Sequence, residues 1–303
     1  MTLPASPLPE RAGAAPLPER AEGDSRGRPS GPWLVALDVD GTVIHEDETL
    51  DDAVAAAVRT ARDRGHEVTL ATGRSWHTVV PILKALGLTP EYVVCSNGAI
   101  TMRREGDVLG EGAPDYVRDH VETFDPTEVL LTVREHLPEG RFLLELPDGT
   151  RLNTAGMVDW DLHNATEVDF EDLLGVEATR FVVVSPDHDI VDFLRIVEDM
   201  GLHRVSYSVG WTAWLDIAPD GVNKATALER VRERLDVPRS RVLAVGDGRN
   251  DIEMFEWARL AGRAVAMGQA PDEVKAVATE VTGTILENGL VPVLLSLPDA
   301  SAG

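Results

Sequence analysis

Short apolar runs alternate with longer amphipathic stretches in the part of the chain that follows a polar N-terminal region. The runs 33–37, 67–71 and 92–95 are largely apolar, and each is followed by polar residues and a glycine. The stretches 51–64 and 75–86 lie between them and predict helices. Strands that alternate with helices in this way are typical of a doubly wound, mostly parallel α/β sheet.

From Ala99 onward the pattern changes to a mixture of strands and helices that resembles an α+β module. It predicts a hairpin at 100–112, strands at 142–146, 181–184, 205–209 and 213–217, and helices at 125–136 and 187–200. The first pattern then resumes, with helices at 221–235 and 252–258, strands at 241–245 and 261–266, and a helix that begins at Pro271. We therefore predict a Rossmann-like core from 31–98 and 219–303 and an inserted domain at 99–218.

Residues 1–30 differ from the rest in composition, because Pro, Gly, Ser and Arg dominate and the hexapeptide PLPERA occurs twice. We predict a disordered Pro-rich tail, with a docking segment as the alternative. The sequence has neither a signal-peptide pattern nor eighteen consecutive apolar residues, so we expect neither secretion nor a membrane span.

Composition narrows the set of partners. A chain of 303 residues with 43% hydrophobic residues is long enough for more than one domain. The net charge of -24 argues against binding to nucleic acid or anionic membranes. It is compatible with a small phosphorylated substrate, because a bound cation can reverse the local field. The single cysteine, Cys95, favours a cytoplasmic location and, in its apolar run, a buried side chain. The oligomeric state stays open.

Two carboxylates, Asp38 and Asp40, directly follow the first predicted strand. In open α/β sheets, ligands bind outside the carboxyl ends of the strands. Carboxylates so close together repel each other unless a cation lies between them or one holds a proton. A tight turn is the alternative interpretation. A calcium loop fits poorly, because Val43 and Thr49 occupy the positions that need Gly and Glu.

Other polar residues at strand ends and at one helix start can face the same crevice: Thr72, Gly73, Lys224, Asp247, Asn250 and Asp251. Together they offer carboxylates, a hydroxyl, an amide and an ammonium group, which suit Mg²⁺ and a phosphoryl group. Hard oxygen ligands favour magnesium over zinc. A dinucleotide site is disfavoured, because Asp251 stands where the G-x-G-x-x-G pattern needs its third glycine.

Five motifs in this order resemble the haloacid dehalogenase-like (HAD) phosphatases, and among them the Cof-type hydrolases with a C2-type α/β cap. They are DVDGT at 38–42, TGR at 72–74, SNG at 96–98, GVNK at 221–224 and GDGRND at 246–251. One position departs from the family, since Ala225 follows Lys224 where Gly is usual. The resemblance implies that the segments 31–98 and 219–303 form the catalytic core and that 99–218 is the cap.

The resemblance also implies a role for each residue. Asp38 would be the nucleophile that forms an aspartyl phosphate, and Asp40 the general acid and base. Mg²⁺ would bind the Asp38 carboxylate, the Asp40 carbonyl oxygen and Asp247, and Asp251 would orient this shell. The phosphoryl oxygens would be bound by Thr72, Gly73, Lys224 and Asn250.

The implied function is a Mg²⁺-dependent phosphatase of a small phosphorylated metabolite, either a sugar phosphate or a cofactor phosphate. A phosphomutase and a non-catalytic binding or regulatory protein are the alternatives. The cap would close over the crevice and select the substrate. Candidate substrate contacts are Arg74, Arg180, His163, Trp211 and Trp214, although packing or surface charge explains each of them equally well.

Overall fold

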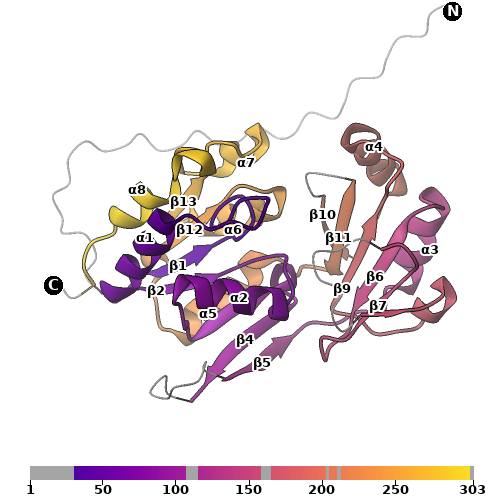
Figure 1. Ribbon diagram of the computed structural model, residues 1–303, viewed down its shortest axis with the longest axis horizontal. Coiled ribbons are helices and arrows are strands. Elements are labelled where there is room, and N and C mark those ends of the chain that lie inside the picture. Colours follow the sequence, from indigo (N-terminus) through magenta and orange to yellow (C-terminus); the bar gives the residue numbers. More distant parts are fainter. Residues whose placement is uncertain (1–30, 107–114, 158–164, 203–204, 210–212, 301–303) are drawn as a thin grey trace, which may run out of the picture.

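The computed structural model describes residues 31–106, 115–157, 165–202, 205–209 and 213–300. The predicted N-terminal tail, residues 1–30, lies outside this part of the chain. Figure 1 shows two bodies side by side, one built from both ends of the described chain and the other from its middle. The predicted combination of an α/β core and an inserted α+β cap is confirmed.

The core is built on a five-stranded sheet with the order β14-β13-β12-β1-β2, in which all neighbours are parallel. The strands are β1 (Leu34–Leu37), β2 (Glu67–Leu70), β12 (Val242–Gly246), β13 (Arg263–Ala266) and β14 (Glu280–Val281). The apolar run of β1 is fully buried between β2 and β12. The sheet therefore brings together segments about 200 residues apart, as a doubly wound topology requires.

Helices cover both faces of this sheet. The helices are α1 (Asp52–Asp63), α2 (Trp76–Leu86), α5 (Lys224–Arg234), α6 (Ile252–Ala258), α7 (Asp272–Val277) and α8 (Leu290–Leu295). Apolar residues of α1, α2 and α8 pack on one face, and those of α5, α6 and α7 pack on the other. Short 3₁₀ helices occur at Ser96–Gly98, Phe170–Leu173, Arg239–Arg241, Arg249–Asp251 and Ile285–Glu287.

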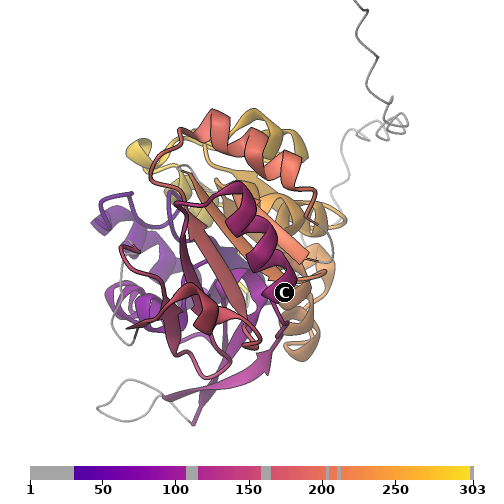
Figure 2. The ribbon, with the colours of Figure 1, turned by 90° about the vertical axis from the view of Figure 1, so that its right-hand side faces the viewer.

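The cap contains a six-stranded sheet with the order β10-β11-β9-β6-β7-β8. Its strands are β6 (Arg141–Glu145), β7 (Arg151–Asn153), β8 (Ala165–Glu167), β9 (Arg180–Val184), β10 (Val205–Val209) and β11 (Trp214–Pro219). Helices α3 (Thr127–His136) and α4 (Ile190–Met200) cover the outer face, as the views in Figures 1 and 2 show. The inner face is turned toward the core.

Side chains alternate between the two faces of the cap sheet, as in any strand. Phe142 and Phe181 pack beneath α3 and α4 in the apolar cluster of the cap. Glu145, Arg180 and Asp216 lie on the inner face and are nevertheless almost fully buried. The inner face therefore presents buried charges to the core.

A third sheet joins the two bodies. It has the order β3-β4-β5, with β3 (Tyr92–Cys95), β4 (Ile100–Glu105) and β5 (Asp115–Val121) in antiparallel pairs. The hairpin predicted for 100–112 is wrong in extent, because its second strand begins at Asp115. Charged residues interrupt the apolar pattern of β5, so its periodicity is weak in the sequence. An isolated bridge between Ala71 and Val94 places β3 beside the core sheet.

Four further elements, β7, β8, β14 and α8, were not predicted. The three strands have only two or three residues each and include charged side chains, so they have no apolar run. The predicted burial of Cys95 is confirmed. Among the described residues, no helix is long and apolar enough to cross a bilayer.

Candidate active site

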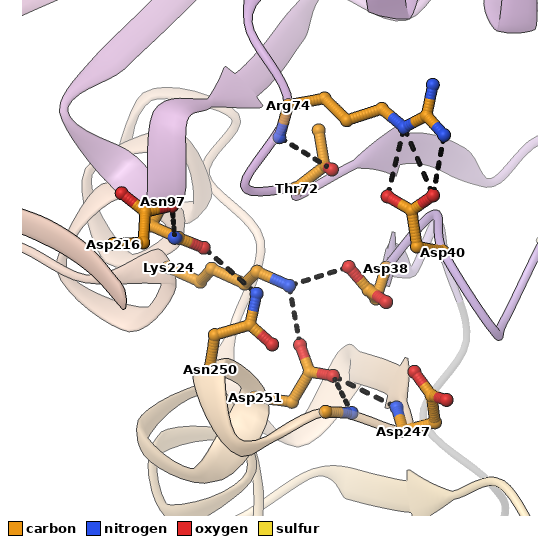
Figure 3. Close-up of polar contacts among 11 residues, drawn as sticks. Asp38, Asp40, Thr72, Arg74, Asn97, Asp216, Lys224, Asp247, Asn250 and Asp251 are labelled. Carbon is orange, nitrogen blue, oxygen red and sulfur yellow. Dashed lines mark hydrogen bonds and ion pairs between the residues drawn. The ribbon is translucent and has the colours of Figure 1, made fainter. Parts of the chain in front are cut away.

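The candidate site lies at the carboxyl ends of β1 and β12, where Figure 3 shows acidic side chains around one lysine. Lys224 is the first residue of α5, and its side chain is fully buried. Its Nζ donates to Asp38 Oδ1 at 2.6 Å and to Asp251 Oδ1 at 2.7 Å. Residues from three distant segments therefore meet at a single ammonium group.

The start of α5 is held by a reciprocal capping arrangement. The backbone amide of Thr226 donates to Asn223 Oδ1 at 3.0 Å, and the amide of Asn223 donates to Thr226 Oγ1 at 3.1 Å. Such a capping box fixes the first turn of a helix. Because Lys224 is part of this turn, the capping fixes the base of its side chain.

Asp251 shapes the loop that follows β12. Its Oδ2 accepts hydrogen bonds from the backbone amides of Asp247 and Gly248, both at 2.9 Å. Its other oxygen is bound by Lys224, so the carboxylate joins the loop to the lysine. The orienting role that we expected for Asp251 toward a metal ion stays a prediction.

Gln269 is a residue of the site that sequence reasoning missed. Its Nε2 donates to Gly41 O at 2.6 Å and lies 3.1 Å from Asp247 Oδ2. It therefore joins the loop after β1 to the loop after β12. Gln269 comes three residues after the end of β13, so the same rule of polar residues at strand ends could have found it.

Gly41 allows these two loops to approach each other. Its φ is +75°, and a Cβ atom at this position would lie 2.1 Å from Asp247 Oδ2. Any side chain here would therefore be strained and would also displace the carboxylate. Gly41 therefore allows the turn after β1 and also the close contact of this turn with the Asp247 carboxylate.

Burial and mutual repulsion change the protonation of the acids. Burial raises the pKa of Asp38 well above its ordinary value of 3.8, and the charge of Asp251 adds to the rise, against the effect of Lys224. Burial, together with Asp251, raises the pKa of Asp247 to about 7. For Lys224, burial lowers the pKa, but Asp251 and Asp38 outweigh it and the net shift is upward. Full ionisation of the three acids would therefore place more negative charge in the site than one ammonium group can balance.

The carboxylates of Asp38, Asp247 and Asp251 converge, with one oxygen from each lying within 4.8 Å of the others. All three side chains are buried. Oxygen donors around an excess of negative charge are the environment that a hard divalent cation such as Mg²⁺ prefers. The residues present therefore fit the expected metal ion.

Asp40 is directed away from this cluster and toward Arg74 (Figure 3). Arg74 Nε lies 3.1 and 3.0 Å from the two carboxylate oxygens of Asp40, and its Nη2 lies 2.6 Å from Oδ1. Arg74 Nη1 also donates to Glu48 at 3.0 Å. The sequence suggested Arg74 as a contact to the substrate. In the structure its guanidinium binds Asp40.

The remaining predicted phosphate ligands border a small polar network. The Thr72 hydroxyl accepts a hydrogen bond from the backbone amide of Arg74 at 3.1 Å. Asn250 Nδ2 donates to Asn97 Oδ1 at 3.0 Å, and Asn97 also lies near Gly73. Asn97 belongs to the third motif, but sequence reasoning assigned it no role.

Residues of the cap reach this network from the inner face of its sheet. Asn97 Nδ2 donates to Asp216 Oδ2 at 2.9 Å, and the hydroxyl of Ser96 donates to Glu145 Oε2 at 3.0 Å. Arg180 Nε donates to Asp216 Oδ1 at 2.9 Å. Sequence reasoning missed the two acids, because a single charged residue in a strand has no local signal for the neighbour it will meet.

The remaining candidate substrate contacts from the sequence are Trp214, His163 and Trp211. Trp214 packs on the inner face of the cap beside Leu143, Met157 and Val182. His163 and Trp211 lie outside the described residues.

The chain is similar to known hydrolases over most of its length. The sequence profile of the haloacid dehalogenase-like hydrolases matches residues 35–294. The 5-amino-6-(5-phospho-D-ribitylamino)uracil phosphatase YitU of Bacillus subtilis is 29% identical over 268 residues, which are 86% of this chain and 95% of that protein. The HMP-PP phosphatase of Yersinia pseudotuberculosis is 28% identical over 244 residues, or 80% of this chain and 86% of that protein.

Solved structures share the same fold. A HAD subclass IIB sugar phosphatase superposes with a TM-score of 0.70 at 20% identity, covering 87% of this chain and 98% of the other. A haloacid dehalogenase-like hydrolase from Bacillus subtilis has a TM-score of 0.68 at 21% identity, covering 88% of this chain and all of that one. Both likenesses cover the core and the cap together.

Proposed function

Since this chain belongs to the haloacid dehalogenase-like hydrolases, we propose that it is a Mg²⁺-dependent phosphatase of a small phosphorylated metabolite. The family, and with it the class of hydrolase, agree with the expectation from the five motifs. The relatives described above are phosphatases whose names give small phosphorylated substrates. The substrate, the metal and the chemical route for this chain are our proposals.

The observation that carries the proposal is the contact of Lys224 with Asp38 and Asp251, with Asp247 beside them. A buried ammonium group among converging carboxylates provides positive charge for a phosphoryl group and a nucleophile for its phosphorus. Phosphoryl transfer is catalysed mainly by such positioning and charge stabilisation.

In the first step, the Asp38 carboxylate attacks the phosphorus of the bound monoester. A bond forms between Asp38 oxygen and phosphorus, and the bond from phosphorus to the leaving oxygen breaks. Asp40 donates a proton to that oxygen, so that the leaving group departs as an alcohol.

In the second step, Asp40 takes a proton from water, and the water oxygen attacks the phosphorus of the aspartyl phosphate. The bond between Asp38 and phosphorus breaks, releasing inorganic phosphate and restoring the Asp38 carboxylate. Asp40 thus serves as acid and then as base. Its ion pair with Arg74 orients it and, in the structure, keeps its carboxylate away from Asp38.

Mg²⁺ would be held by the Asp38 carboxylate, the Asp40 carbonyl oxygen and Asp247, with Asp251 orienting the shell. When bound, it neutralises the nucleophile and polarises the phosphoryl group. Thr72, the Gly73 amide, Lys224 and Asn250 would bind the phosphoryl oxygens. Gln269 would hold Asp247 against the loop of Gly41.

We propose that residues 99–218 act as the cap that closes the site and selects the substrate, and that 31–98 and 219–303 carry the chemistry. Contacts of Glu145 and Asp216 with the third motif support this division. We further propose a cytoplasmic location, which suits a protein whose single thiol is buried.

Phosphate release from a panel of sugar phosphates and cofactor phosphates, with Mg²⁺ and with EDTA, tests this function. We expect release that requires Mg²⁺ and is abolished by Asp38→Asn. The matched control is Asp63→Asn, which removes an exposed acid at the end of α1 and should leave turnover unchanged. Turnover by Asp38→Asn equal to that of the parent would exclude Asp38 as the nucleophile.

A further inference from the structure

A cavity of about 100 Å³ lies between the candidate phosphate ligands and the cap. Lys224 and Asn250 line its core side, and Asp216 of β11 and Tyr207 of β10 line its cap side. The cavity therefore adjoins the place proposed for the phosphoryl group.

The size of the cavity suits a small leaving group. One water molecule needs about 10–15 Å³ on the same measure, so the cavity has room for roughly seven to ten water-sized groups. This is the size of a sugar or a short polyol. Hydroxyl and amide groups of Ser206, Tyr207, Asn97 and Asn223 line it as well.

The side chains that line the cavity include more acidic groups than basic ones. Among the described residues that line the cavity, Lys224 is the only cation, and its ammonium is already bound by Asp38 and Asp251. Asp216 and Glu253 contribute carboxyl groups. A leaving group that carries its own negative charge would meet two acids, of which only Asp216 has a cation beside it, the Arg180 guanidinium.

Asp216 is held rigidly in this wall. Arg180 Nε donates to its Oδ1 at 2.9 Å, Asn97 Nδ2 donates to its Oδ2 at 2.9 Å, and the side chain is 8% exposed. Each carboxylate oxygen can accept more than one hydrogen bond, so both retain acceptor capacity toward the cavity. A carboxylate fixed from behind is a preorganised acceptor for hydroxyl or amino donors.

We propose that this cavity receives the leaving group and that Asp216 determines its charge. The enzyme would then prefer phosphate monoesters whose leaving group is uncharged or cationic and rich in hydrogen-bond donors, and would reject those with a carboxylate or a second phosphate. This inference rests on the proposed phosphatase activity and adds the class of substrate to it.

Three substrates with six carbon atoms each test the proposal: glucose 6-phosphate, glucosamine 6-phosphate and 6-phosphogluconate. They differ mainly in leaving groups that are neutral, cationic and anionic. Acetyl phosphate serves as a reporter of the chemistry, because its acetyl group is much smaller than a sugar and has no hydroxyl groups. For each sugar compound, kcat/KM and the inhibition constant against acetyl phosphate are measured with Mg²⁺.

The parent should prefer the neutral and cationic compounds over 6-phosphogluconate by about tenfold or more, since like charges at close range cost a large binding penalty. Asp216→Asn should reduce this preference to about threefold or less, and should change hydrolysis of 6-phosphogluconate, relative to acetyl phosphate, in the direction of the neutral compound. Glu253→Gln, which changes a solvent-exposed acid that lines the same cavity, should shift the preference in the same direction. Asp192→Asn, an exposed acid on α4, should not shift it.

Three results would overturn the inference. In the first, the parent hydrolyses the three compounds with equal kcat/KM. In the second, none of the three is hydrolysed or competes with acetyl phosphate. In the third, Asp216→Asn lowers the activity on every compound equally, including acetyl phosphate. The last result would mean that Asp216 only holds the cap against Asn97. If the folded parent fails to hydrolyse acetyl phosphate with Mg²⁺, the phosphatase proposal itself fails, and this inference fails with it.

Discussion

Lys224 Nζ lies 2.6 Å from Asp38 Oδ1, although 186 residues separate the two in the chain. Both side chains are almost completely buried, and Asp251 shares the same ammonium group. Removing one member of a buried ion pair leaves an uncompensated charge and is strongly destabilising. The stability and the chemistry of this site therefore depend on the same contact.

Lys224→Met should lower the free energy of unfolding by about 3–5 kcal/mol in EDTA, because Asp38 and Asp251 lose their counter-charge. It should also lower phosphatase activity by several orders of magnitude, through the loss of a phosphoryl ligand. Urea unfolding at pH 8 and phosphate release measure the two effects. In the double variant Lys224→Met/Asp38→Asn, stability should recover in part while activity does not. A single variant as stable as the parent would show that the pair is not coupled.

Arg74 is predicted to position Asp40 rather than to bind substrate. Arg74→Lys keeps a positive charge but loses the paired contacts of the guanidinium with both Asp40 oxygens. We expect kcat to fall by about tenfold or more, with KM changed by less than about threefold. Steady-state kinetics on one good substrate separate the two constants. A raised KM at unchanged kcat would return Arg74 to the role of a substrate contact, as the sequence first suggested.

Gly41→Ala should abolish metal-dependent activity. A Cβ atom there would displace the Asp247 carboxylate, and the positive φ adds strain of about 1–2 kcal/mol. Gly175→Ala is a matched control, since its φ is +72° but a Cβ atom would meet nothing within 4 Å. Both variants should lose similar stability from backbone strain, measured by thermal unfolding in EDTA. Only Gly41→Ala should lose Mg²⁺ binding, so equal Mg²⁺ binding by both variants would contradict this account.

The pKa of Asp247, raised to about 7 by burial and by Asp251, predicts how stability depends on pH without metal. Between about pH 4 and 7 the folded state binds the proton that the unfolded chain releases. This stabilising contribution is therefore full below about pH 4 and is lost as the pH rises toward 7. The free energy of unfolding in EDTA should fall with pH in this window, by up to about 1.4 kcal/mol per unit from this group.

Comparison of the parent with Asp247→Asn isolates this group from the many other acids of the chain. The variant should show a shallower fall of stability with pH, whereas Asp63→Asn should follow the parent. Mg²⁺ should stabilise the parent more at pH 7.5 than at pH 5, because the metal binds the ionised carboxylates. Identical slopes for the parent and Asp247→Asn would show that this carboxyl does not titrate in the window.

The sequence alone determined the elements that rest on local periodicity. The buried strand before Asp38, the helices α1 and α5 and the return to the core after Pro219 were all visible as apolar runs, amphipathic stretches and glycines. The acids at strand ends were visible too, because the end of an apolar run places a polar side chain at the edge of a parallel sheet. The order of the motifs then indicated the family.

Contacts between distant segments were decided only by the tertiary structure. The pairing of Arg74 with Asp40, the bridge made by Gln269 and the position of Asp216 beside Asn97 join loops that the chain's local pattern cannot relate. The short charged strands of the cap also depend on their neighbours rather than on their own propensity. Periodicity reports which face of an element is buried, whereas partners across a site follow from how whole sheets and loops pack together.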